Sequence, residues 1–378
     1  MITVEMLPAA HGDALWVEWP GKGSDVHRML VDAGPSATYE AVFERVRRLP
    51  PRSRHLDVLV ATHVDADHIE GVIRLLQDRV ALKLAIDDVW FNGWPQISEP
   101  AGLLGADQGE MLQALIGSQQ LCWNAAFGRA APGKPPHAVC LRAQGAAPAV
   151  DLPGGARATL VGPGRPELDK LLKEWDRVVR GLGVTPGKPD EALDRLAHRR
   201  SLRGLAADLL GGGRLDASVP NGSSIAFLLE HDGKRLLLTG DGHGEVLARG
   251  VDRLLKQLGG TRLTVDALKV PHHGSAANVT DVLLSRLDTR RFLVSTNGDK
   301  FNHPDPEAID RMLAAVDRLD GADPPHAAGP DADTGRAELV FNYRSRTTEP
   351  WADPARQRAR HYTAVYPATA AAGTTVEV

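Results

Sequence analysis

The sequence predicts an α/β protein. Short runs of β-branched and apolar residues alternate with longer stretches in which apolar residues recur every three or four positions, and these patterns are typical of strands and amphipathic helices. Several of the strand-like runs end in groups of histidine and aspartate. Loops at strand ends are where a rigid scaffold carries functional residues, so the observations that predict the fold also indicate a site.

The N-terminal region predicts a strand meander followed by a helix and a buried strand. Three β-like runs, at 3–6, 15–19 and 28–32, are separated by Gly and Pro. The stretch 39–49 places its apolar residues on one face and predicts an amphipathic helix. The next run, Val58-Leu59-Val60-Ala61, is continuously apolar, which favours a buried strand.

The middle of the chain predicts a strand at 89–91, a helix within 101–127 and a further strand at 157–163. Residues 128–155 are rich in Gly, Pro and Ala and predict a surface excursion. The stretch 166–217 contains two charged amphipathic patterns joined by Gly and Pro, and we interpret it as a helical insertion. It is either a lid over the main domain or an ordinary helical pair with no part in binding.

Strand patterns resume after residue 221 and continue to about 345. The predicted elements are strands at 224–230, 234–239, 267–270, 291–294 and 338–343, with helices at 245–258 and 306–319. His231-Asp232-Gly233 predicts the turn of a hairpin between the first two of these strands. The main domain is therefore predicted to span 1–345, and the polar, Ala- and Thr-rich segment 346–378 to be a C-terminal tail that is ordered only in part.

Composition excludes several classes of protein. The 378 residues carry a formal net charge of -4, so no global basic field is present to hold nucleic acid. The two cysteines, Cys122 and Cys140, do not form a metal-type CxxC motif or a disulfide framework. The N-terminus lacks a signal-peptide pattern, and no apolar run approaches the roughly 18 residues of a membrane span. We expect a soluble cytoplasmic protein without membrane contacts; the sequence does not identify a protein partner.

The segment Thr62-His63-Val64-Asp65-Ala66-Asp67-His68 is the most informative part of the chain. Residues two apart in an extended chain face the same side, so His63, Asp65 and Asp67 can converge, with His68 at the start of the following helix. Carboxylates are almost never buried unless they are paired or bind a metal. The segment therefore indicates a metal site, with a solvated loop as the alternative.

Three further clusters follow predicted strands. Asp241 follows Leu236-Leu237-Leu238-Thr239, His272 and His273 follow Lys269-Val270-Pro271, and His303 lies after the strand at 291–294. Such clusters at four separate strand ends point to one shared metal centre. A separation above about 10 Å between Asp241 and His63 or His68 would exclude it, because zinc–ligand bonds span only about 2 Å.

Together these motifs resemble the metallo-β-lactamase superfamily, and most closely the hydrolase-like domain of ComEC-type competence proteins and their soluble relatives. The matching segments are Gly12-Asp13-Ala14, Leu30-Val31-Asp32-Ala33-Gly34, His63 to Gly71, Asn221-Gly222-Ser223-Ser224, Leu238-Thr239-Gly240-Asp241, Leu268 to Ser275 and Asn302-His303-Pro304. The resemblance implies an αββα sandwich, in which two mixed sheets lie between outer helices and metals bind at one sheet edge.

The resemblance also implies a ligand set. His63 and Asp65 would bind a first metal, Asp67 and His68 a second, and Asp241 would bridge the two. One further histidine would complete the second site, and the candidates are His272, His273 and His303, of which the last two are favoured.

Several nearby residues have two possible roles. Lys269 and His272 would either lie near the developing charge of the substrate or support the ligands from behind. Asp13 and Asp32 are expected to orient a ligand imidazole rather than to act in catalysis. Asn92 either lines the cleft or belongs to a turn, and the turn is favoured.

The sequence departs from the superfamily pattern at two points. Asp65 replaces the middle histidine of the usual HxHxDH motif, and the usual third-motif histidine is missing. Between His68 and Asp241 only His137, His198 and His231 occur, and all three are expected at the surface. The resulting site is rich in oxygen ligands, which suits manganese or magnesium, while zinc also accepts aspartate. We predict zinc, as one or two ions, with manganese as the alternative.

The predicted chemistry is metal-dependent hydrolysis by a metal-bound hydroxide, which requires no serine or cysteine nucleophile. Asp67 or Asp241 would accept the proton, while Lys269 and His272 would stabilise charge on a phosphoryl oxygen. A phosphodiester, in a nucleic acid or nucleotide, is the favoured substrate. The alternatives are a catalytically weak binding or scaffold module and a lactamase- or esterase-type hydrolase of amides or esters.

Overall fold

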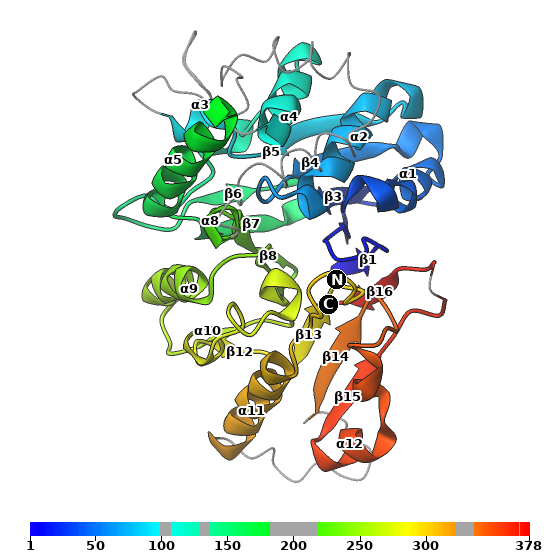
Figure 1. Cartoon of the computed structure of the whole chain (residues 1–378), viewed down its shortest axis with the longest axis vertical. Helices are drawn as coiled ribbons and strands as arrows, with labels where there is room; N and C mark the ends of the chain where they lie inside the picture. Colours follow the sequence, from blue (N-terminus) through cyan, green and yellow to red (C-terminus); the bar gives the residue numbers. More distant parts are fainter. Residues whose placement is uncertain (99–106, 129–136, 182–217, 323–335, 370) are drawn as a thin grey trace.

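A computed structural model describes residues 1–98, 107–128, 137–181, 218–322, 336–369 and 371–378. Within these ranges the strands form two large sheets and one two-stranded pair. The order in the first sheet is β16-β1-β2-β3-β4-β5, and the order in the second is β15-β14-β13-β11-β9-β8-β7-β6. The predicted α/β class and its two-sheet arrangement are confirmed (Figure 1).

The first sheet contains the N-terminal meander. Its strands are β1 (Thr3–Met6), β2 (Leu15–Pro20), β3 (Val26–Val31), β4 (His55–Val60), β5 (Ala85–Trp90) and β16 (Thr374–Glu377). Strands β1, β2 and β3 pair antiparallel, whereas β3, β4 and β5 are parallel. Parallel neighbours require crossover connections, and α1 (Tyr39–Arg47) and α2 (Ala66–Leu82) provide them.

The second sheet contains the remaining long strands. They are β6 (Ala149–Asp151), β7 (Arg157–Gly162), β8 (Ala226–His231), β9 (Lys234–Leu238), β11 (Ala267–Lys269), β13 (Arg291–Val294), β14 (Ala337–Phe341) and β15 (Tyr362–Val365). Strands β6 to β9 are antiparallel, and β9, β11, β13, β14 and β15 are parallel. The short pair consists of β10 (Leu263–Thr264) and β12 (Leu287–Asp288).

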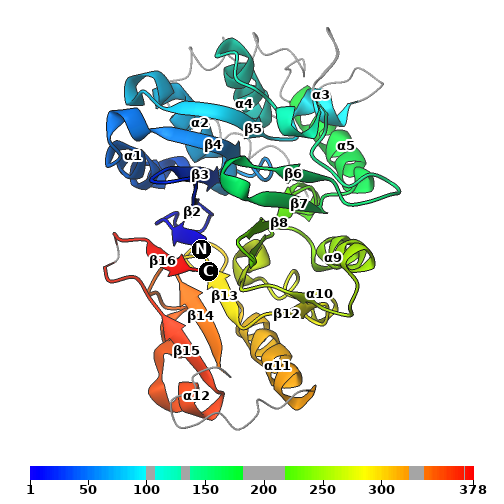
Figure 2. The same ribbon diagram turned by 180° about the vertical axis from the view of Figure 1, so that it is seen from behind.

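The sheets pack face to face, and helices cover their outer sides. The further helices are α3 (Trp94–Ile97), α4 (Asp107–Ser118), α5 (Arg165–Gly181), α8 (Ser218–Gly222), α9 (Gly244–Leu258), α10 (Asp281–Leu284), α11 (Pro306–Ala322) and α12 (Pro354–Ala359). Val58 and Val60 of β4 join the core between the sheets, while Leu59 joins the cluster under α1 and α2. Figure 2 shows α1, α2 and α4 beside the first sheet and α9, α10 and α11 beside the second.

The C-terminal segment corrects one prediction. Residues after 346 are not a partly ordered tail, because β15 pairs with β14 and β16 pairs with β1. The ring of Tyr362 is fully buried against Trp351. Polar and Ala- or Thr-rich composition misled the prediction, since an added sheet strand needs only backbone hydrogen bonds and one apolar face.

The predicted insertion is described in its first half only. Helix α5 covers the first amphipathic pattern, and its apolar stripe of Leu168, Leu171 and Trp175 is buried in the core under the first sheet. The second pattern lies in 182–217, outside the described residues, so the lid interpretation stays a prediction.

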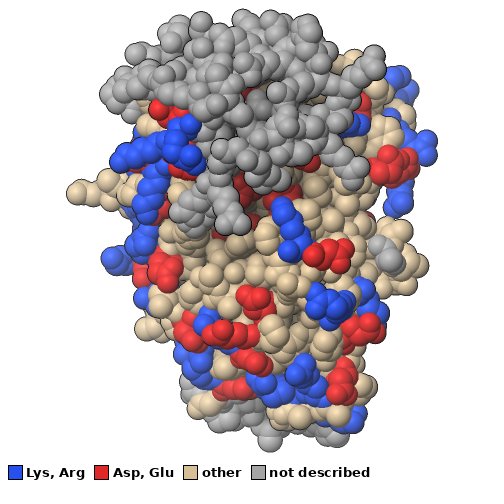
Figure 3. Space-filling view, viewed as in Figure 1, with Lys and Arg blue, Asp and Glu red and all other residues tan. Residues whose placement is uncertain are grey.

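The surface has no dominant sign of charge on the face drawn in Figure 3. Over the described part of this face, basic and acidic side chains are interspersed. Within the described ranges every helix is too short or too polar to cross a lipid bilayer.

Candidate metal centre

Parallel pairing explains why the predicted site residues meet. Strands β3 and β4 run in register from Met29 beside Val58 to Val31 beside Val60, and just beyond their ends the backbone N–H of Thr62 donates to Oδ1 of Asp32 at 2.8 Å. Strands β9, β11 and β13 are likewise parallel, and their carboxyl ends bring the loops after each of them to one edge. The site therefore lies where both sheets end.

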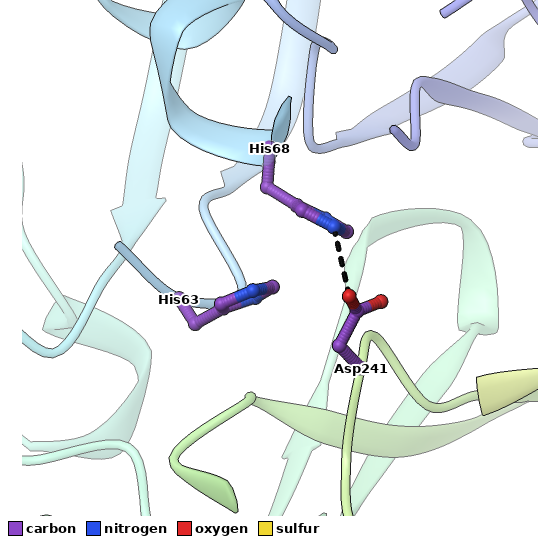
Figure 4. Close-up of side chains that lie close together, drawn as sticks. All are labelled: His63, His68 and Asp241. Atoms are coloured by element: carbon purple, nitrogen blue, oxygen red, sulfur yellow. Dashed lines mark ion pairs between the residues drawn. The ribbon is translucent and has the colours of Figure 1, made fainter. Parts of the chain in front are cut away.

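Three buried side chains occupy the centre of this edge. His63 comes from the loop after β4, His68 from the first turn of α2, and Asp241 from the loop after β9 (Figure 4). Nε2 of His68 lies 3.2 Å from Oδ2 of Asp241. One ligand atom of each of the three residues lies within 4.8 Å of the others. The separation that would have excluded a shared metal is therefore not found.

A second group of three overlaps the first. His273, in the 3-10 turn Pro271–Gly274, places its Nε2 3.3 Å from Nε2 of His68 and 3.3 Å from Oδ2 of Asp241. Ligand atoms of Asp67, His68 and His273 also lie within 4.8 Å of one another. Asp65 lies at the rim, with its Oδ2 3.7 Å from Nε2 of His63 and a quarter of its side chain exposed.

Hydrogen bonds to Nδ1 aim these imidazoles into the site. Nδ1 of His68 bonds to Oδ2 of Asp32 at 2.8 Å, and Nδ1 of His273 bonds to the carbonyl of Ser295 at 2.9 Å. Nδ1 of His63 lies 2.9 Å from the hydroxyl of Thr62. Each ring therefore directs Nε2 inward. Such second partners fix the ring orientation of histidines that bind metals.

Asp32 is positioned to orient the ring of His68. Its two oxygens accept hydrogen bonds from the backbone N–H and the hydroxyl of Thr62, at 2.8 and 2.7 Å, in addition to that of His68. The residue is fully buried and has a φ of 56°. His272 and His273 also have positive φ values, 45° and 55°, and such strained non-glycine backbone concentrates at functional sites.

The charges and unpaired atoms of the site fit a cation. Four aspartates are buried here, Asp13, Asp32, Asp67 and Asp241, while Lys269 is the only lysine or arginine buried among the described residues. Within the same described residues, Nε2 of His63 and Oδ1 of Asp241 are buried without a hydrogen-bond partner. Leaving such atoms unpaired costs about 1–3 kcal/mol each, and a divalent ion would satisfy both.

Protonation of the histidines follows from the same excess of negative charge. Burial lowers the pKa of His273, but the carboxylates of Asp241 and Asp13 outweigh burial and raise it to about 10. Burial also opposes the charged form of His68, yet Asp241 and Asp32 raise its pKa well above the ordinary value. In turn the two imidazoles lower the pKa of Asp241 despite its burial. Protons and metal cations therefore compete for these nitrogens.

Lys269 supports the site from behind. Its side chain is fully buried, and Nζ lies 2.6 Å from Oδ2 of Asp13 and donates to the carbonyl of Val270 at 3.0 Å. Oδ1 of Asp13 lies 3.5 Å from Nδ1 of His273. Of the two roles considered for Lys269, this position favours orientation of the ligands over contact with a substrate.

The other two candidates for the additional ligand, His272 and His303, lie in different surroundings. His272 has Nε2 3.9 Å from Oδ2 of Asp241 and is partly exposed. His303 instead pairs with Asp305 at 3.2 Å, so the geometry favours His273 over His303 as the additional ligand. Asn92 exchanges two hydrogen bonds with the backbone of Val139 and anchors that loop.

Two of the histidines expected at the surface are described, and one prediction fails. His137 is exposed, as predicted, whereas His231 is only 4% exposed and its Nε2 bonds to the carbonyl of Gly154 at 3.2 Å. Gly154 belongs to the 3-10 turn Pro153–Gly155 between β6 and β7, and the local sequence does not indicate that this turn contacts the hairpin. His198 lies outside the described residues.

Sequence reasoning missed two residues beside the site. Nε2 of His11 lies 3.8 Å from Oδ2 of Asp67, and the place of His11 next to the Gly12-Asp13 motif was a usable signal. Asn278 donates to the carbonyl of Asp241 at 3.0 Å and accepts from His272. No motif marks Asn278, because its role depends on the tertiary position of its loop.

A comparison with models of protein families matches residues 24–296 to the metallo-beta-lactamase superfamily. The chain belongs to this superfamily. The matched region contains the His63 segment, Asp241 and both histidines of the 3-10 turn. A search of curated proteins finds no sequence that matches.

Solved structures show a distant likeness. A Zn²⁺-bound PqqB from Methylobacterium extorquens is 11% identical, with all of both chains covered and a TM-score of 0.40. A diphosphatase of the PhnP family is 12% identical, with 100% of this chain and 98% of that chain covered and a TM-score of 0.38. The CmlA beta-hydroxylase E377D mutant is 12% identical with a TM-score of 0.41, and this chain spans 54% of its length.

Proposed function

We propose that this protein is a metal-dependent phosphodiesterase, acting on a nucleotide or nucleic acid, with zinc or manganese as the cation. One observation carries the proposal: buried His68, His273 and Asp241 meet within 3.3 Å, while His63 and Asp241 each keep a buried ligand atom unpaired. An ion bound among these atoms would relieve the repulsion between the close Nε2 atoms of His68 and His273. It would also give ligand bonds to the unpaired atoms of His63 and Asp241.

The donor atoms divide between two ions. Nδ1 of His68 is used by Asp32, so His68 offers only Nε2 and serves one ion. We assign it with Asp67 and His273 to one ion, and His63 with Asp65 to the other. Asp241 has two carboxylate oxygens and would bridge them, because Oδ2 faces His68 and His273 while Oδ1 is unpaired.

When bound, the cations supply Lewis acidity and lower the pKa of water. The residues of this chain orient the reacting groups and move the proton. Asn278 donates its amide hydrogens to the carbonyls of Asp241 and Gly242, so its Oδ1 faces His272 and accepts from Nδ1, at 3.0 Å. The network thereby assigns the proton of neutral His272 to Nδ1. Its Nε2 lies at the partly exposed side of the site, 3.5 Å from Nδ2 of Asn221 and 3.9 Å from Oδ2 of Asp241, where it can accept a proton from water or give one to a leaving group.

A phosphodiester fits the composition of the site better than an amide. Asp65, Asp67 and Asp241 give three carboxylates, and oxygen-rich donor sets favour hard cations of the kind used in phosphoryl transfer. The resemblance to ComEC-type hydrolase domains agrees with a nucleic-acid or nucleotide substrate. The weak net charge favours a short substrate over long, nonspecific binding.

The test is turnover of bis(p-nitrophenyl) phosphate by protein loaded with zinc or manganese. Asp241→Asn and His63→Ala should each reduce turnover at least 100-fold and lower the bound metal measured by elemental analysis. The matched controls are Asp232→Asn, in the exposed hairpin turn, and His137→Ala, both of which should behave as the parent protein.

Other outcomes would favour the alternatives. Unchanged turnover in both site variants would reject the mechanism. A parent protein that retains no metal and cleaves nothing would favour the scaffold module. Turnover of nitrocefin or a lactone without phosphodiester cleavage would favour an amide or ester hydrolase.

A further inference from the structure

A row of aromatic and imidazole rings borders the metal centre. It begins at His11, whose Nε2 lies 3.8 Å from Oδ2 of Asp67. The ring of His11 meets Phe301 edge-on, with 6.2 Å between ring centroids. Phe301 in turn lies 6.0 Å from the ring of His303.

The row returns to the metal centre on its other side. The rings of His303 and His272 are 5.4 Å apart, and Nε2 of His272 lies 3.9 Å from Oδ2 of Asp241. The rings therefore run from one proposed ligand, Asp67, to another, Asp241, along a single rim. Anything bound at the cations on this side would lie against them.

Phe301 is the unusual member of the row. Its side chain is 46% exposed, and it is the only aromatic residue among the exposed large hydrophobic side chains of the described ranges. The other such side chains are Met1, Val26, Val80, Leu258 and Val282. Core packing does not explain a phenyl ring that keeps nearly half of its surface in water beside a cluster of ligand-type residues.

A cation accompanies the exposed ring. Nζ of Lys300 lies 4.7 Å from the centroid of Phe301 and 3.5 Å from Nε2 of His11. The ammonium group of Lys300 thus lies over the phenyl ring on the rim. Nucleobases stack on aromatic side chains, and phosphates attract lysine, so the pair matches two parts of one nucleotide.

We infer that this rim is a base-stacking subsite, in which Phe301 holds a nucleobase and Lys300 a phosphate oxygen. The inference rests on the proposed phosphodiesterase function and narrows its substrate to nucleotide-type phosphodiesters. A ring that stacks on bases tolerates different bases, because each has a π face, so little base selectivity is expected.

The test compares two phosphodiesters that differ by one base. The first is thymidylyl-thymidine, and the second is the same molecule with one base replaced by hydrogen. The parent should cleave the first with a higher kcat/KM, by a factor of roughly 5 to 100. Phe301→Leu, which keeps an apolar side chain without the ring, should bring this ratio close to 1, whereas Phe301→Tyr should preserve it. Val282→Ala removes exposed apolar surface on α10 and is the matched control.

Calorimetry measures the affinity of ligands for the subsite and does not depend on turnover. The manganese-loaded protein should bind thymidine 5′-monophosphate more tightly than deoxyribose 5-phosphate, and Phe301→Leu should remove the difference. A parent that binds or cleaves both members of a pair equally, or a Phe301→Leu variant that keeps the preference, would overturn the inference while leaving the phosphodiesterase proposal intact. Preferential binding of the nucleotide without any phosphodiester cleavage would instead reject the phosphodiesterase and keep the subsite.

Discussion

The buried ion pair between Lys269 and Asp13 gives the sharpest prediction about the architecture of the site. Lys269 is fully buried, Asp13 is 1% exposed, and the charged atoms are 2.6 Å apart. Lys269→Met keeps the length of the chain but leaves the carboxylate of Asp13 buried without its ammonium. Removing one partner of a buried pair costs about 3–5 kcal/mol.

An exposed lysine–aspartate pair provides the comparison for this loss of stability. Lys234 and Asp266 are 2.9 Å apart, but their side chains are 47% and 31% exposed. Lys234→Met should therefore cost less than about 1 kcal/mol. At roughly 2 °C per kcal/mol, Lys269→Met should lower the Tm of metal-free protein by about 6–10 °C and Lys234→Met by at most about 2 °C.

The double variant Asp13→Asn with Lys269→Met removes both charges. It should lose less stability than the sum of the two single variants, because neither charge is then buried alone. Thermal unfolding followed by circular dichroism measures the parent, the single variants Lys269→Met, Asp13→Asn and Lys234→Met, and the double variant. Equal destabilisation by Lys269→Met and Lys234→Met would refute the reasoning. If Lys269→Met stays folded and binds metal as the parent does but has lost turnover, while Asp13→Asn keeps its turnover, Lys269 acts on the substrate.

Three further predictions concern the ligands, the packing and pH. Asp32→Asn should weaken metal affinity about 10- to 100-fold by freeing the ring of His68, with competition against a chromophoric chelator as the measurement; unaltered affinity would contradict the orienting role. Gly250→Ala should strongly lower the free energy of unfolding, because the added Cβ would lie 1.8 Å from a backbone oxygen of β7. Gly117→Ala has open space around the added Cβ and should raise the free energy of unfolding by up to about 1 kcal/mol. A similar change in Tm in both variants would argue against this packing. The raised pKa values of His68 and His273 stabilise the metal-free fold fully below about pH 6.5, and this stability should disappear as the pH rises toward about 10; a Tm of metal-free protein that is flat or rises over this range would contradict the assignment.

Much of the fold and part of the site could be predicted from the sequence, because their determinants are local. A continuous apolar run identified the strand before His63, and the helical spacing of apolar residues identified the helices α1, α2, α9 and α11. The histidines and aspartates after strands marked the candidate ligands, since such side chains have little reason to follow buried strands unless they bind something.

The tertiary structure alone decided how these groups combine. The fold placed Asp32 against His68 and His273 against Asp241, while His303 pairs with Asp305, and none of these contacts follows from spacing along the chain. Lys269 is buried behind the site, where it pairs with Asp13. The segment predicted to be a tail contributes β15 to the second sheet and β16 to the first. Distances between segments far apart in sequence depend on the packing of whole sheets, so a local pattern can name the chemical groups but cannot set their geometry.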